Sequence, residues 1–222
     1  QSNLNNQLAG VDLNLRSSNW WNEQSVSWHG FFMTSDDEDE NSDDVIGTHF
    51  TFPNYPFRAS GHWVRTGDNF NPALGFVRRR GGESTGLGFT YYFEQPENEL
   101  LEDISVGAEY DRYEWLDGDL DSDELEINLI GIRTLAGDFL GLEVEFERDI
   151  LQEPFEIIDE VIIPSSEYKG IDFELEFRSS SNRPVFGEFE IAYGNFYGGK
   201  ATNAEIDLSW RPSKYFQLDF EI

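Results

Sequence analysis

The residues of this chain best placed to do chemistry are its carboxylates, because they recur at every second position of several segments. Asp and Glu number 44 against 15 Lys and Arg, which gives a formal net charge of −29. Clustered carboxylates attract cations and, as pairs, act as acid and base in glycoside hydrolysis. With so many acids the sequence singles out no catalytic pair, so we expect no enzymatic activity. The recurring acids of interest are Glu143, Glu145, Glu174, Glu176, Glu188 and Glu190.

Other groups that could hold a metal or cofactor are few. Cys is absent, which excludes disulfides, thiolate metal sites and Cys nucleophiles. The histidines His29, His49 and His62 lack zinc-ligand spacing, so we expect ordinary polar residues. The acidic run 35–44 offers oxygen ligands for Ca²⁺, but such runs are more often solvated loops. Residues 117–124 lack the Gly and Glu of a calcium loop and indicate an acidic hairpin tip. We therefore expect no metal site and no cofactor.

Apolar residues fill the positions between the carboxylates. Ile171, Phe173 and Leu175 alternate with acidic residues, and the same pattern recurs around 142–147, 188–191, 205–210 and 216–222. Because successive side chains of a strand point to opposite faces, these segments are expected to be strands with one apolar and one charged face. A transmembrane β-barrel with a water-filled lumen uses both faces in this form. The six acids named above would then face the lumen.

The whole chain is expected to be all-β, with helical periodicity nowhere evident. Short turns, for example at 54–56 and 136–137, join most strands and indicate an antiparallel up-and-down meander. Two connections are long, 35–44 and 149–170. The thirteen expected strands cover residues 10–16, 24–34, 45–52, 57–65, 73–80, 85–93, 104–115, 123–132, 139–148, 171–178, 184–193, 201–211 and 215–222.

The end of the chain bears on the expected strand number. The alternation continues to Ile222 without a turn. Bacterial single-chain barrels have an even number of strands, whereas thirteen are expected here. We therefore expect residues 1–222 to be one barrel segment, truncated at its C-terminal end and belonging to a larger barrel.

One segment carries a family resemblance. Residues 67–81, "GDNFNPALGFVRRRG", resemble a signature of bacterial outer-membrane β-barrel domains of unknown function, which often follow a module like family 9 carbohydrate-binding domains. "LAGVDLNLR" and "IDLSWRPSKYFQLDFEI" resemble further strands of that family. The family has no agreed catalytic residues, and we expect the three arginines to pair with carboxylates. The signature residues are Asn69, Phe70, Asn71, Pro72, Gly75, Phe76, Arg78, Arg79 and Arg80.

These observations predict a protein of the bacterial outer membrane, acting as a pore or as an anchor or scaffold for an envelope assembly. Its expected partners are outer-membrane lipid, other envelope proteins and cations in the lumen. The strong negative charge argues against nucleic acid, since phosphate binding needs cationic surface. The alternative is a soluble, acidic β-sandwich acting as a carbohydrate-binding module or glycoside hydrolase, because a sandwich strand also alternates. The two differ in where the apolar face lies, in a shared core or on the outside.

Overall fold

The computed structural model describes residues 6–37, 42–72, 75–77, 79–95, 97–158 and 160–222. Contacts within the chain divide it into two compact units. The first unit contains Gln1–Phe89 and Tyr110–Asp123, and the second contains Thr90–Glu109 and Glu124–Ile222.

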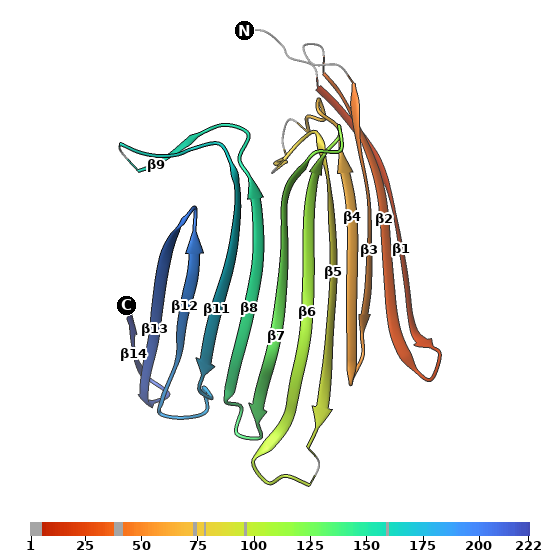
Figure 1. The fold of residues 1–222 in the computed structure, drawn as a ribbon. Coiled ribbons are helices and arrows are strands. Elements are labelled where there is room, and N and C mark those ends of the chain that lie inside the picture. The colour runs from red at the N-terminus through yellow and green to blue at the C-terminus, as the bar shows by residue number, and fades with distance from the viewer. Residues whose placement is uncertain (1–5, 38–41, 73–74, 78, 96, 159) are drawn as a thin grey trace. The chain divides into compact units, whose positions relative to one another are not determined.

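All regular secondary structure in the described residues is β-strand, as the sequence predicts (Figure 1). No helix of the described residues is long and apolar enough to cross a membrane. The fourteen strands are β1 (Asn6–Trp20), β2 (Gln24–Asp37), β3 (Asp43–Pro53), β4 (Phe57–Thr66), β5 (Gly82–Glu94), β6 (Leu101–Trp115), β7 (Leu120–Thr134), β8 (Phe139–Ile150), β9 (Phe155–Ile158), β10 (Val161–Ile163), β11 (Glu167–Arg178), β12 (Val185–Phe196), β13 (Gly199–Ser213) and β14 (Phe216–Glu221).

The strand order follows the chain, which confirms the expected meander. Twelve strands form one sheet in the order β1 to β8 and then β11 to β14, and every strand pairing with a recorded register is antiparallel. β9 and β10 form a separate two-stranded sheet. Within the described residues β1 and β14 each have one neighbour, so the sheet has two edges. Closure into a barrel stays a prediction.

Twelve of the thirteen expected strands coincide with observed ones, and the expected strand 73–80 is wrong. Its described residues, 75–77 and 79–80, adopt no strand and belong to the loop that joins β4 to β5. That loop is held by contacts with distant residues, which override the local pattern. The connection 149–170 contains β9 and β10, which the sequence reading missed.

In the first unit, β1 to β4 form three successive hairpins. The turn between β3 and β4 begins after the pair Pro53 and Arg58. The Asn54 side chain accepts a hydrogen bond from the backbone N–H of Ser25 and donates one to its carbonyl, both at 2.7 Å. This turn residue therefore also fixes the neighbouring end of β2.

In the second unit, β8, β11, β12, β13 and β14 pair in that order. The turn from β7 to β8 uses Gly137, whose φ of +88° is unfavourable for residues with a Cβ. The backbone N–H of Gly137 donates to the Thr134 carbonyl at 2.9 Å. Residues directly paired across antiparallel strands share a face, so the register sorts the side chains of this unit into two faces.

Burial is unusual for a protein of this size. Among the described residues only Val45, Phe70 and Val144 are buried apolar side chains. Large apolar residues along the strands are instead exposed, for example Phe173 at 50 % and Leu208 at 44 %. The apolar face is therefore not covered by a second layer within the described residues.

Candidate functional site

The six predicted carboxylates lie on one face of the second unit. Glu143 of β8 is directly paired with Glu174 of β11, and Glu176 of β11 with Glu190 of β12. Glu145 lies two residues after Glu143 on β8, and Glu188 two residues before Glu190 on β12, so each shares a face with its neighbour. The two-residue period of each strand thus collects these acids into a band, here called the carboxylate face.

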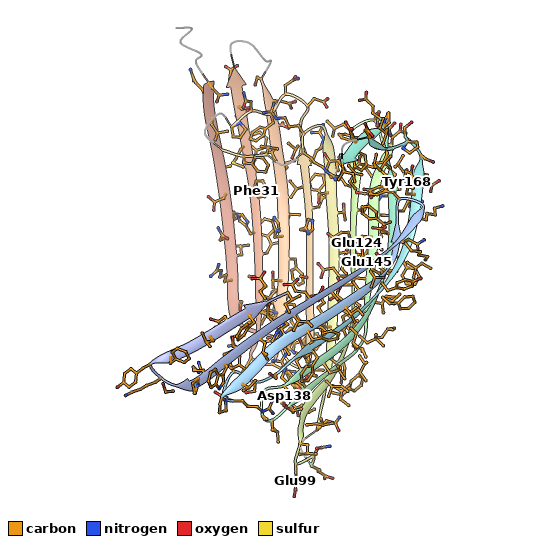
Figure 2. The ribbon with its side chains drawn as sticks, turned by 90° about the vertical axis from the view of Figure 1, so that its left-hand side faces the viewer. Phe31, Glu99, Glu124, Asp138, Glu145 and Tyr168 are labelled. Atoms are coloured by element: carbon orange, nitrogen blue, oxygen red, sulfur yellow. The ribbon has the colours of Figure 1, made fainter. Side chains whose placement is uncertain are left out.

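Part of the carboxylate face is hollowed. The hollow has a volume of about 280 Å³ and lies wholly within the second unit. Figure 2 shows Glu124 next to Glu145 at this band. Like charges on paired strand positions repel, so hydration and mobile cations are needed to stabilise this arrangement. The acidic residues lining the hollow are Glu126, Glu143, Glu145, Asp172, Glu174 and Glu190.

Fixed positive charge offsets only part of the band. Arg178 forms ion pairs with Glu176 and, at 3.0 Å, with Glu188. Asn128 donates a hydrogen bond from Nδ2 to Glu143 Oε1 at 3.0 Å, which satisfies that oxygen without adding charge. Arg133 lies 4.0 Å from Asp103 instead. Arg178 and Arg133 are therefore paired with acids that lie outside the lining of the hollow.

The turn between β7 and β8 contains a separate, well-defined ion pair. The Asp138 carboxylate accepts hydrogen bonds from Arg183, with Nη2 to Oδ2 at 2.6 Å, and from the Ser180 backbone N–H at 2.9 Å. These hydrogen bonds, that from Arg183 foremost, lower the pKa of Asp138 to about 2. Asp138 therefore stays ionised in acid that neutralises ordinary carboxylates, and it ties the turn before β12 to the turn before β8.

The signature residues build a loop of the first unit. Phe70 is only 2 % exposed, and two backbone N–H groups beside it are bound by side chains of other strands. Asn69 N–H donates to Asp43 Oδ2 at 2.9 Å, and Asn71 N–H donates to Ser35 Oγ at 2.8 Å. Ser35 is itself 1 % exposed. The loop is therefore packed against the start of β3 and the end of β2.

The remaining signature residues have varied surroundings. Gly75 N–H donates to the Pro72 carbonyl at 3.3 Å, and Phe76 is 89 % exposed. Arg79 forms an ion pair with Asp121, as expected for these arginines. Arg80 donates to Asn71 Oδ1 at 3.4 Å. Arg78 lies outside the described residues. This segment thus has a structural role in the first unit, and no anion-binding arrangement is formed by its described residues.

The two acidic loops differ in what the structure describes. Residues 38–41 of the first lie outside the described residues. The second is the tip between β6 and β7, where Asp119 N–H donates to Asp117 Oδ1 at 3.0 Å and Gly118 has φ +92°. An acidic hairpin tip is what the sequence predicts there.

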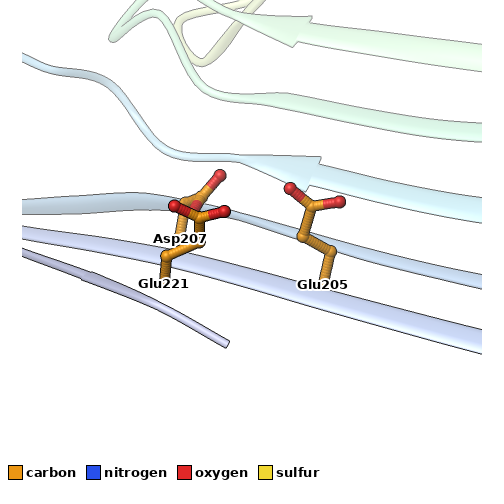
Figure 3. Close-up of side chains that lie close together, drawn as sticks. All are labelled: Glu205, Asp207 and Glu221. Carbon is orange, nitrogen blue, oxygen red and sulfur yellow. The ribbon is translucent and has the colours of Figure 1, made fainter.

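A further acidic group was not singled out from sequence. Glu205, Asp207 and Glu221 bring carboxylate oxygens within 4.8 Å of one another on β13 and β14 (Figure 3). All three are exposed. Water hydrates such a group readily, so proximity alone does not define a metal site.

The sequence analysis treated the three histidines as separate polar residues, whereas the structure brings them together. His29 is paired with His49 across β2 and β3, and His49 with His62 across β3 and β4. The pairing of His49 with His62 could have been predicted from the sequence. Pro53 and Arg58 flank the turn, and His49 lies four residues before Pro53 while His62 lies four residues after Arg58, so the two histidines are opposite each other in the hairpin. The first pair was not accessible in this way, since the connection between β2 and β3 is long.

No protein family model, curated protein or solved structure matches this chain.

Proposed function

We propose that this chain is a segment of a bacterial outer-membrane β-barrel, with its apolar face toward lipid and its carboxylate face toward a water-filled lumen. The observation that carries the proposal is the exposure of the apolar face. On β11 the residues Ile171, Phe173, Leu175 and Phe177 are 38–50 % exposed although each is a large apolar side chain.

The energetic reason is the cost of leaving such a face in water. Burying a large apolar side chain contributes about 1.5–3 kcal/mol, and soluble monomers rarely expose apolar patches beyond a few hundred Å². On β13 the side chains of Ile206, Leu208 and Trp210 continue the same face at 42–44 % exposure. Hydrocarbon would cover these residues without a second protein layer.

The carboxylate face supports the lumen half of the proposal. Carboxylates in lipid would be prohibitively expensive, whereas a hydrated lumen lets them keep their charge. The lumen would then concentrate cations, so an open pore would prefer cations over anions. In a closed lumen the same face would be merely solvated, and the barrel would act as an anchor or scaffold for an envelope assembly.

The proposal also sets a requirement on the sheet edges. Unpaired backbone groups are not tolerated in hydrocarbon, so β1 and β14 must both be covered by strands in a membrane-inserted barrel. The resemblance of residues 67–81 to an outer-membrane barrel family agrees with this proposal.

The soluble β-sandwich is the rival function class. A sandwich needs a second sheet over the apolar face. The described residues contain only β9 and β10 outside the main sheet, and these strands have four and three residues. A carbohydrate-binding or hydrolytic role is therefore not favoured by any specific arrangement of the described residues.

Planar-bilayer recording tests the pore. Under a salt gradient the reversal potential should indicate cation preference, which should weaken as salt screens the acids. A variant with Glu145→Gln and Glu174→Gln should lose part of this preference, whereas the turn variant Asp138→Asn should retain it. Anion preference would contradict the electrostatic reasoning. Membrane insertion without conductance would favour the anchor or scaffold role.

A further inference from the structure

All three histidines of the chain lie in one cross-strand row of the first unit. The rings of His29 and His49 stack with centroids 6.0 Å apart, and those of His49 and His62 with centroids 5.7 Å apart. Three positions separated by 20 and 13 residues in sequence thus become neighbours through the register of β2, β3 and β4. This row is here called the histidine row.

The row continues beyond β4 to oxygen ligands. His62 Nε2 lies 3.1 Å from Ser84 Oγ on β5 and 3.8 Å from Asp111 Oδ1 on β6. Gly86 makes this approach possible, because a Cβ there would collide with both the His62 ring and the Asp111 carboxylate. The end of the row therefore combines an imidazole nitrogen with a carboxylate across an intervening glycine.

Most imidazole nitrogens of the row are available. Within the described part of the chain the His29 and His49 side chains make no hydrogen bond, and their ring contacts are with each other, with Phe31 and with His62. His49 is exposed and His29 is half-buried, so their ring nitrogens are open to solvent and to a dissolved metal ion. Here the ring stacking is the main interaction of two of the three.

We propose that the histidine row binds a divalent transition-metal ion, with His49 and His62 as the central ligands and His29 and Asp111 as flanking ones. Imidazole is a preferred ligand of Zn²⁺, Ni²⁺ and Cu²⁺, whereas carboxylates alone suit Ca²⁺ and Mg²⁺. The net charge of −29 raises the local concentration of any such cation. By the general affinity order, Cu²⁺ should bind most tightly.

The donor atoms of the histidine row do not yet converge on a single point, so metal binding requires side-chain movement. No three donor atoms of the row approach within 4.8 Å of one another, a spacing that only the Glu205 group reaches among the described residues. Because these donor atoms do not converge, the histidine side chains must rotate about their side-chain bonds to bring their nitrogens to one ion. The row thus offers a site of paired imidazoles rather than a preformed cage.

Cu²⁺ titration of the purified 222-residue chain tests this proposal, with bound metal observed by electron paramagnetic resonance at pH 7.5. We expect nitrogen hyperfine structure from at least two imidazoles. The variants His49→Phe and His62→Phe keep a flat ring in the stack, and each should weaken Cu²⁺ binding at least tenfold. The matched control Asp207→Asn alters the exposed acidic group and should leave this signal unchanged.

Acid provides a second readout that needs no variant. A protonated imidazole nitrogen has no lone pair for a metal ion, so the nitrogen signal should be lost on acidification. Circular dichroism establishes that each variant is folded. A spectrum with oxygen ligands alone, or no Cu²⁺ binding by the unmodified chain, would overturn the proposal. Unchanged affinity in both folded Phe variants would also overturn it.

Discussion

The loss of unfolding free energy on replacing Leu175 with arginine distinguishes a lipid-facing strand from a water-facing one. Leu175 lies in the apolar row of β11, directly paired with Leu142 of β8 and Ile191 of β12. It is 38 % exposed, so its neighbours cover roughly three fifths of it. The question is what covers the rest.

The two readings predict different costs. If the uncovered part meets water, Leu175→Arg loses about 1–2 kcal/mol of apolar burial, and the aliphatic stem of arginine restores part of that. If it meets hydrocarbon near the middle of a bilayer, the guanidinium costs about 2–4 kcal/mol. We expect the larger cost, because the row continues on either side through Phe173 and Phe177.

Glu174→Arg is the matched control, since it places the same side chain one residue away on the carboxylate face. Glu174 is paired with Glu143, so a cation there relieves repulsion and should leave stability unchanged or slightly higher. Urea unfolding from lipid vesicles, followed by tryptophan fluorescence, measures both. A cost below about 2 kcal/mol at Leu175, or equal costs at the two positions, would refute the reasoning.

Three further predictions concern single contacts. Phe70→Ala removes the most buried apolar side chain of the described residues and should cost about 3–5 kcal/mol in denaturant unfolding. A cost below about 1 kcal/mol would contradict its role in the core. Because the pKa of Asp138 is lowered to about 2 in the folded state, its ionised carboxylate stabilises the fold above the unfolded pKa, and this stability is lost as pH falls from about 4 to 2. Asp138→Asn should therefore make the melting temperature less dependent on pH over that range, and an unchanged pH profile would contradict this. Gly194→Ala should destabilise by about 1–3 kcal/mol in thermal unfolding, because its Cβ would overlap Asp172; a neutral effect would show that β11 shifts freely.

Most strands could be predicted because their information is local. Alternation such as that of 171–178 needs only period two, and turn residues such as Ala136-Gly137 mark where it stops. The strand expected at 73–80 failed because its surroundings are not local. Phe70 is buried and its neighbours bind Ser35 and Asp43, more than 25 residues earlier in the chain. No pattern within 67–81 encodes those contacts.

The candidate sites also differ in how much of each could be predicted from local sequence. That Glu174 and Glu176 share a face follows from parity, and the register then shows their partners Glu143 and Glu190. The histidine row depends on register across three strands. The short turn after Pro53 encodes half of that register, but the long connection between β2 and β3 does not encode the rest. Spacing in sequence therefore gave no sign that His29 belongs with the other two.

The central claim, that the apolar face meets lipid while the carboxylate face meets water, is tested most directly by spin-label accessibility along β11. The chain has no cysteine, so single Cys variants at positions 171–177 can each carry one nitroxide label. In lipid vesicles, labels at 171, 173, 175 and 177 should collide with dissolved oxygen, and labels at 172, 174 and 176 with a water-soluble nickel chelate. Strong collision with the nickel chelate at Phe173 and Leu175 would contradict the account.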